Sequence, residues 1–207
     1  MQKIKLRHQK SCIAFFLVSF VLLTISSVAL AHQPRIIYLQ KGDVQINDPD
    51  LSQAFYDELK GESKSYFINS DKDFELYINL LVPNPENRDG RYSANIFNSD
   101  GQKIYFIDGL LFEWQEFYEP FGRDYYLKGP ELDQQVPAGK YKIEVFSAGS
   151  SKQEDNQGKY ILAVGKTELY NFQSFSVQGV LSNVSPILNV YWQLPFLKVT
   201  FFKTSVL

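Results

Sequence analysis

Cysteine and histidine are nearly absent from this chain, which contains one cysteine and two histidines in 207 residues. Cys12 and His8 both lie within the first 31 residues, so only His32 follows that segment. Disulfide frameworks, thiol nucleophiles, Cys/His zinc sites and Ser-His-Asp triads all need residues that positions 32–207 lack. An enzyme built on this chain would have to use carboxylates, a Ser-Lys pair or a metal held by oxygen ligands.

The first 31 residues have the pattern of a secretory signal peptide. A basic stretch without any acidic residue comes first, with Lys3, Lys5, Arg7 and Lys10. The apolar run Ile13–Leu30 follows, and Ala29 and Ala31 fit the small-residue rule for cleavage before His32. The run is also long enough to remain as an uncleaved N-terminal membrane anchor. In both cases the basic residues stay in the cytoplasm, so we expect an exported protein in the periplasm or at the outer face of the cytoplasmic membrane.

The remainder of the chain is acidic. Removing the four basic residues of the signal from the 21 in the chain leaves 17 basic against 23 acidic residues, a net charge of about −6. This charge excludes a basic nucleic-acid-binding domain. The length suits one domain, which we place at 32–166, followed by a tail at 167–207. The 13 Tyr and 17 Phe residues favour a strand-rich fold, because aromatic rings pack well on pleated surfaces.

Alternating and β-branched patterns predict eight strands. They are Arg35–Leu39, Val44–Ile46, Tyr66–Ile68, Phe74–Val82, Tyr92–Phe97, Lys103–Ile107, Lys140–Phe146 and Lys159–Gly165. The turn Asn98–Gly101 joins two of them as a hairpin, and we expect the last two to form a second hairpin with a long polar tip. The spacing implies antiparallel pairing.

One short helix is predicted near the N-terminus. Asp48 and Pro49 provide helix-start signals, and Gly61 provides a stop signal. Apolar residues between them follow helical spacing, at Leu51, Ala54, Phe55 and Leu59.

The segment Leu110–Pro130 is the richest in aromatic residues. It contains Phe112, Trp114, Phe117, Tyr118, Phe121, Tyr125 and Tyr126. On a helical turn Glu113, Glu116 and Glu119 would share one side and the rings the other. One interpretation is that this insertion caps the open end of a β-sandwich and buries its rings.

The other interpretation of this segment is a recognition surface. Its candidate residues are Trp114, Tyr118, Tyr125, Tyr126, Glu113 and Glu116. Exposed rings beside carboxylates suit a protein partner or a sugar, because rings bury area at low entropic cost and carboxylates accept hydroxyl hydrogen bonds. Two carboxylates at a suitable separation would also allow glycoside hydrolysis.

Oxygen-rich turns are the candidates for a metal site. Asn69, Asp71 and Asp73 alternate in one turn, and Asn98 and Asp100 flank another. Neither turn has the sixth-position glycine and twelfth-position glutamate of an EF-hand loop. Ordinary turn chemistry is therefore favoured over calcium, and we predict no metal and no cofactor.

The tail lacks acidic residues from Leu169 to Leu207, and its only charges are Lys198 and Lys203. Its apolar residues Val177, Val180, Leu181, Val184, Leu188, Tyr191 and Trp192 follow helical spacing, with Gln178, Ser182, Asn183, Ser185, Asn189 and Gln193 largely opposite. Pro186 would kink such a helix. The polar residues argue against a membrane span and favour an amphipathic segment.

Three placements of this tail are open. It packs on the sandwich, docks a partner, or lies in the outer face of the membrane. In the membrane placement the interfacial residues are Trp192, Phe196, Phe201 and Phe202, with Lys198 and Lys203 near the headgroups.

The stretch Lys64–Gly165 resembles the secreted β-sandwich domains of the bacterial pre-peptidase C-terminal type. The resemblance is carried by Tyr66–Ile68, Asn98–Gly101, Val136–Tyr141 with Ile143 and Val145, and Gly158–Gly165. It implies an antiparallel jelly-roll-like sandwich that serves as an accessory or binding module. The whole chain also resembles a group of exported bacterial proteins with the same signal and aromatic insertion. This second resemblance implies no particular activity.

The predicted fold class is mainly β: an antiparallel jelly-roll-like β-sandwich with one short N-terminal helix, an aromatic helical or loop insertion and an amphipathic helical C-terminal tail. The leading hypothesis is a non-catalytic cell-envelope module that binds a protein partner or the membrane surface, and not nucleic acid. A carbohydrate-binding domain is the alternative, and a carboxylate-based glycoside hydrolase comes third.

Overall fold

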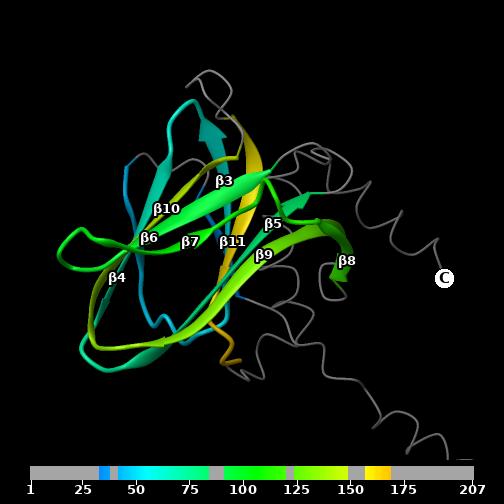
Figure 1. Cartoon of the computed structure of the whole chain (residues 1–207). Coiled ribbons are helices and arrows are strands. Elements are labelled where there is room, and N and C mark those ends of the chain that lie inside the picture. The colour runs from blue at the N-terminus through cyan, green and yellow to red at the C-terminus, as the bar shows by residue number, and fades with distance from the viewer. Residues whose placement is uncertain (1–32, 38–41, 84–90, 120–123, 149–156, 169–207) are drawn as a thin grey trace, which may run out of the picture. The chain divides into compact units, whose positions relative to one another are not determined.

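The computed structural model describes residues 33–37, 42–83, 91–119, 124–148 and 157–168 (Figure 1). These residues form eleven strands and no helix. The strands are β1 (Gln33–Ile36), β2 (Val44–Ile46), β3 (Gln53–Lys60), β4 (Lys64–Ser70), β5 (Phe74–Pro83), β6 (Tyr92–Phe97), β7 (Lys103–Ile107), β8 (Gln115–Glu119), β9 (Asp124–Val136), β10 (Gly139–Ser147) and β11 (Gln157–Val164). The predicted signal segment and the tail beyond Glu168 lie outside the described residues.

Two sheets pack face to face as a sandwich (Figure 1). Sheet A has the strand order β1-β3-β11-β5-β9-β8, and sheet B has the order β2-β4-β10-β6-β7. The prediction of a β-sandwich is therefore confirmed. The prediction of purely antiparallel pairing is wrong at two edges, because β1 pairs with β3 and β2 pairs with β4 in parallel. The chain alternates between the sheets along β1 to β4, so no tight hairpin forces these pairs to be antiparallel.

The short N-terminal helix predicted before Gly61 is wrong, since these residues form β3. Phe55 and Leu59 face the core between the sheets, while Ala54 and Tyr56 face outward and are also buried. Because β3 is buried on both faces, its apolar residues do not alternate strictly with polar ones, and the spacing of Leu51, Ala54, Phe55 and Leu59 also matches a helical template. Backbone pairing with β1 and β11 makes this segment a strand and not a helix.

The second predicted hairpin is also wrong. β10 pairs with β4 and β6 in sheet B, whereas β11 pairs with β3 and β5 in sheet A. Its long polar connection does not force the two strands to pair, and each lies in the middle of its own sheet. The first hairpin is confirmed, because β6 pairs with β7 and Asn98 Oδ1 accepts hydrogen bonds from the N–H groups of Asp100 (3.1 Å) and Gln102 (2.9 Å).

The main core lies between the two sheets and follows the predicted alternation. Phe74, Leu76, Ile78 and Leu80 of β5 are at most 2% exposed. The inward-facing Tyr141, Ile143 and Val145 of β10 belong to the same cluster. Alternate residues on a strand face opposite sides, so these two strands present their apolar faces to each other across the sandwich.

A second apolar cluster lies on the outward side of sheet A. Its buried members are Ala54, Tyr56, Leu81, Tyr126, Ile161 and Ala163. We call this set the outer apolar cluster. Each member alternates with a residue of the main core on its own strand, or with a residue packed against that core, so the cluster points away from sheet B.

Candidate functional site

The aromatic segment forms a loop and two strands in the described residues rather than a helix. After a loop through Trp114, β8 pairs with the first half of β9, with Phe117 opposite Tyr126 and Tyr118 opposite Tyr125. The helix face that was predicted to carry Glu113, Glu116 and Glu119 is therefore not formed in the described residues of this segment. The aromatic content fits a strand as well as a helix, and cross-strand pairing stabilises the strand.

Trp114 anchors the loop to both sheets. Its Nε1 donates a hydrogen bond of 2.8 Å to the carbonyl oxygen of Gly109, whose N–H donates to Ser93 Oγ at 3.0 Å. The indole ring packs against the main core, and the Arg91 guanidinium carbon lies 5.7 Å from its centroid. Trp114 is therefore half-buried, and its N–H is already used within the protein.

Two glycines make room for this anchor. A Cβ on Gly129 of β9 would lie 2.4 Å from two ring atoms of Trp114. A Cβ on Gly109 would lie 1.8 Å from the carbonyl oxygen of Tyr92. Any side chain at either position would displace the ring or the backbone that holds it, so the loop is fixed between the end of β7 and the middle of β9.

The loop presents its apolar side chains to solvent. Asp108 Oδ1 accepts hydrogen bonds from the N–H groups of Leu110 (2.9 Å) and Leu111 (3.2 Å), which closes a tight turn. Leu110 is 56% exposed and Leu111 is 84% exposed. A leucine this exposed in a hydrogen-bonded turn contributes little to the core, so these positions are candidates for contact with another molecule.

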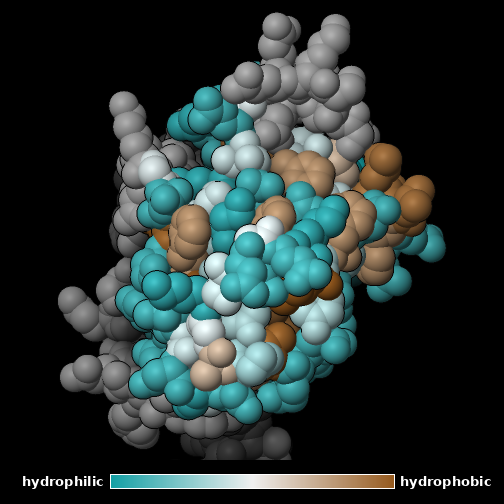
Figure 2. Space-filling model, turned by 60° about the vertical axis from the view of Figure 1, so that its left-hand side comes forward, coloured by the Kyte–Doolittle hydropathy of each residue, from teal (hydrophilic) through white to brown (hydrophobic). Residues whose placement is uncertain are grey.

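The residues from Phe106 to Tyr125 expose further large hydrophobic side chains. Including the two leucines, the exposed set consists of Phe106, Leu110, Leu111, Phe112, Phe117, Tyr118 and Tyr125. We call this set the aromatic edge. Figure 2 shows one face of the molecule, which is mostly hydrophilic and carries hydrophobic side chains toward one edge. The sequence analysis did not choose Phe106, Leu110, Leu111, Phe112 or Phe117 as site residues. The run Gly109-Leu110-Leu111-Phe112 directly after a strand and an Asp-Gly turn is the signal that would have found the leucines.

The structure brings together three of the six predicted site residues. Directly paired residues share a face, so Glu116 (opposite Leu127), Tyr118 and Tyr125 lie on one side of the β8–β9 pair. The rings of Tyr118 and Tyr125 are 5.0 Å apart at an angle of 49°. Their hydroxyl-bearing rings and the exposed Glu116 form a surface with both apolar and polar character.

The other three predicted residues are placed differently. Tyr126 is 3% exposed and belongs to the outer apolar cluster, so it does not contribute to an exposed surface. Trp114 serves as the anchor described above. Glu113 is exposed in the loop before β8, away from the paired strands that hold Glu116.

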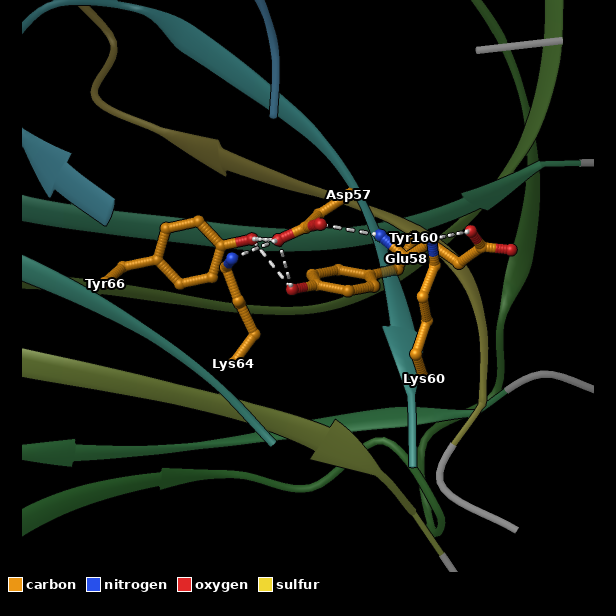
Figure 3. A network of polar contacts seen from close by, with 6 residues as sticks. All are labelled: Asp57, Glu58, Lys60, Lys64, Tyr66 and Tyr160. Carbon is orange, nitrogen blue, oxygen red and sulfur yellow. Dashed lines mark hydrogen bonds and ion pairs between the residues drawn. The ribbon is translucent and has the colours of Figure 1, made fainter. Parts of the chain in front are cut away.

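A buried polar network lies elsewhere between the sheets (Figure 3). Asp57 Oδ2 accepts hydrogen bonds from the hydroxyls of Tyr66 (3.0 Å) and Tyr160 (3.3 Å), and the two hydroxyls are 2.7 Å apart. Lys64 Nζ lies 3.9 Å from the same carboxylate oxygen, and Asp57 Oδ1 accepts from the Glu58 N–H at 2.8 Å. The network joins β3 and β11 of sheet A to β4 of sheet B.

This network is structural rather than reactive. Asp57 is 2% exposed, and Tyr66 and Tyr160 are fully buried, so no substrate reaches them. Burial raises the pKa of Asp57, while the Glu58 N–H and Lys64 oppose the rise. Burial likewise raises the pKa of both tyrosines, which keeps their hydroxyls protonated as donors. Sequence reasoning missed the network because the predicted helix did not place Asp57 in the core.

The oxygen-rich turns use their oxygens for backbone hydrogen bonds. Asp73 Oδ1 accepts from the N–H of Ala138 at 2.9 Å, and Asn98 caps its own hairpin. Within the described ranges, no three His, Cys, Asp or Glu side chains are grouped so that they could hold a metal ion.

The predicted membrane-interface residues lie outside the described residues. They are Trp192, Phe196, Lys198, Phe201, Phe202 and Lys203. In the portion of the chain that is described, no helix has the length and apolar character needed to span a bilayer.

No protein-family model and no curated protein sequence matches this chain. Among solved structures it is similar to the pre-peptidase C-terminal domain of a collagenase from Bacillus anthracis, with 13% identity and a TM-score of 0.37 over 58% of this chain and 92% of that chain. The resemblance identified from the sequence is thus also a structural similarity.

Two further similar structures are bacterial proteins. PliG of Salmonella Typhimurium, a periplasmic inhibitor of g-type lysozyme, shares 15% identity at a TM-score of 0.33, over 59% of this chain and 96% of PliG. CorA of Methylomicrobium album, a surface-associated copper-binding protein, shares 9% identity at a TM-score of 0.33, over 61% of this chain and 98% of CorA.

Proposed function

We propose that this protein is an exported, non-catalytic β-sandwich that binds a protein partner through the aromatic edge. The observation that carries the proposal is the concentration of exposed apolar side chains in one stretch of the chain. Within the described residues, all the large hydrophobic side chains that are exposed lie between Phe106 and Tyr125. Exposed apolar side chains that gather in one region mark interaction sites in soluble proteins.

The rigidity of the aromatic edge supports this function. The Trp114 anchor, the Asp108 turn and the β8–β9 pairing hold these side chains in place before any partner arrives. A preorganised surface loses less conformational entropy on binding, so more of the apolar contact energy contributes to affinity. A loop that only capped the sandwich would bury its leucines instead.

The chemistry of the edge favours a protein over a sugar. Leu110, Leu111 and Phe112 bring aliphatic and aromatic surface without hydrogen-bonding groups, which matches the apolar centre of a protein interface. Sugar binding is the alternative, and the grouping of Tyr118, Tyr125 and Glu116 on one face favours it. No such observation supports a glycoside hydrolase based on Glu113 and Glu116.

Site-specific photo-crosslinking in cells of the source organism tests the proposal. A photoreactive amino acid replaces Leu111 in the full chain, and the matched control replaces Lys140, which is exposed on the outward side of β10. We expect a discrete protein adduct from position 111 and none from position 140. The adduct should be lost when Leu110 and Phe112 are both replaced by serine. The absence of an adduct at 111, or the same adducts at both positions, would contradict the proposal.

Glycan titration separates the alternative. Soluble envelope glycans are added to the purified full chain, and binding is followed by calorimetry. Binding that survives Leu111→Ser but is lost in Tyr118→Ala with Tyr125→Ala would favour the carbohydrate-binding function over the protein partner.

A further inference from the structure

The outer apolar cluster is buried although it faces away from the sandwich core. Its six residues are between 3% and 9% exposed. Sheet B covers only the inner side of sheet A, and the described strands all belong to one of the two sheets. Sheet A is thus apolar on both sides at this point, which is typical of a sheet that is covered on both sides.

The cluster is one continuous patch across the sheet. Ala54 pairs with Ala163, and Tyr56 pairs with Ile161, which pairs in turn with Leu81. The patch runs from β1, where the half-buried Ile36 packs against it, to Tyr126 on β9. Five neighbouring strands at about 4.8 Å spacing give it a width of about 20 Å.

The patch has a sharp polar boundary on the same side of sheet A. Further along β5 and β9, Lys166 Nζ forms ion pairs with Glu75 (2.8 Å) and Asp133, and the three side chains are 41–47% exposed. Tyr77 donates to Glu131 at 3.2 Å in the same region. The charged half of this outer side is therefore in contact with water, and the apolar half is not. Whatever covers sheet A on this side is limited to the apolar half.

The corresponding side of sheet B is different. Lys140, Lys142 and Glu144 alternate on β10 with the core residues, and they are exposed or half-exposed. An antiparallel sheet with one solvated face shows this pattern. Only sheet A has the composition of an internal layer.

The chain leaves the described fold beside the patch. Ser52 donates its N–H to the Thr167 oxygen (2.9 Å), and its hydroxyl donates to Glu168 at 3.2 Å. Glu168 is thus bonded to Ser52, and Ser52 precedes Ala54, the first member of the cluster on β3, by two residues. The segment 169–207 starts at the edge of the patch.

The composition of that segment suits an apolar surface. It contains no acidic residue and only two lysines, and its helically spaced apolar residues include Val180, Leu181 and Leu188. A helix rises about 1.5 Å per residue, so a fraction of the segment is long enough to cross the 20 Å patch. Burying it there would require few charges to leave water.

We propose that the segment 169–207 of the same chain covers the outer apolar cluster of sheet A. The apolar stripe of the segment packs on Ala54, Tyr56, Ile161 and Ala163, and its polar side faces solvent. The segment is then a third layer of the domain rather than a membrane-bound tail. This inference does not depend on the proposed binding function, whose test position Leu111 lies in the loop between β7 and β8.

Thiol accessibility tests the proposal in the full chain. Cys12 is the only cysteine, so Cys12→Ser gives a thiol-free background. Ala163→Cys places a thiol in the patch, and Ser65→Cys places one on the outward side of sheet B as the matched control. We expect the thiol at position 163 to react about 100-fold more slowly than the thiol at position 65 with a charged reagent, because it is reached only after local opening.

Substitutions within the segment 169–207 test whether this segment is what covers the outer apolar cluster. Val180→Asp with Leu181→Asp should raise the reaction rate at position 163 toward that at position 65, while leaving the rate at position 65 unchanged. Gln178→Asp with Asn189→Asp, on the polar side of the segment, should change neither rate. A second apolar pair, Val184→Asp with Leu188→Asp, provides the same test if the first variant does not fold.

Four outcomes would overturn the proposal. Fast labelling at position 163 in the unaltered segment would show that the patch is open. Protection that persists in both apolar-to-Asp variants would assign the cover to another part of the chain. Protection that disappears on dilution would assign it to a second copy. Protection that appears only with phosphatidylglycerol vesicles would assign it to a membrane.

Discussion

Two pairs of tyrosines in this protein have opposite environments. The hydroxyls of Tyr66 and Tyr160 meet at 2.7 Å in the core and share the carboxylate of Asp57, whereas the rings of Tyr118 and Tyr125 are 5.0 Å apart and exposed. The buried pair joins one sheet to the other, and the exposed pair joins only neighbouring strands of sheet A. The same residue type therefore holds the sandwich together in one region and is available to a partner in the other.

The largest expected difference between the two pairs concerns removal of the ring. Tyr160→Ala should lower the free energy of unfolding by about 3–5 kcal/mol, because it leaves a cavity in the core. Tyr118→Ala, the matched exposed variant, should change it by no more than about 0.5 kcal/mol. Urea unfolding of the full chain measures both. Equal losses in the two variants would show that the exposed pair also supports the fold.

Removal of a single hydroxyl should give a smaller difference. Tyr66→Phe deletes a donor to the buried Asp57 carboxylate, so we expect a loss of about 1–3 kcal/mol. Tyr125→Phe keeps the ring at the exposed position and should leave stability unchanged. The same unfolding experiment applies, and a neutral Tyr66→Phe would mean that Asp57 is satisfied without this tyrosine.

The anchor beneath the exposed pair can be weakened on its own. Trp114→Phe removes the hydrogen bond to the Gly109 oxygen and should lower stability by about 1 kcal/mol. It should also reduce photo-crosslinking from position 111, because the loop loses its fixed position. Retention of full crosslinking in a destabilised Trp114→Phe protein would separate the anchor from the binding surface.

The smallest expected effect is the pH dependence of the buried network. Burial raises the pKa of Asp57 above its usual 3.8 in the folded chain, so the folded state binds this proton more tightly than the unfolded state. The contribution to stability is present below the unfolded pKa and is lost as pH rises through the folded pKa. Asp57→Asn cannot titrate, so its stability relative to the unmodified protein should improve from about pH 3 to about pH 7. A difference that stays constant over this range would mean that the pKa of Asp57 is the same in both states.

The sequence was informative where apolar and polar residues alternate along a strand. The alternation in Phe74–Val82 and Lys140–Phe146 and the polar turn at Asn98 led to correct strands and a correct hairpin. It was less informative at β3, which is buried on both faces. Burial on both faces removes the strict alternation of apolar and polar residues from β3, so a helix was predicted and Asp57 was not placed in the core.

The aromatic segment remains the candidate site, and the structure decides which of its residues are exposed. Aromatic density identified the segment, yet exposure depends on which side of β9 each ring occupies. Tyr125 and Tyr126 differ by one position and therefore face opposite sides, one exposed and one buried. That assignment follows only from the pairing of β9 with β5 and β8, which local patterns do not encode.

The strand order also determines when the fold can be completed. β10 lies between β4 and β6, and β11 lies between β3 and β5, so the last two strands of the domain fill the middle of both sheets. A chain delivered from its N-terminus can form the β6–β7 and β8–β9 hairpins early, but neither sheet can close before β10 and β11 have arrived. The nascent protein thus stays open until nearly the whole domain has been synthesised.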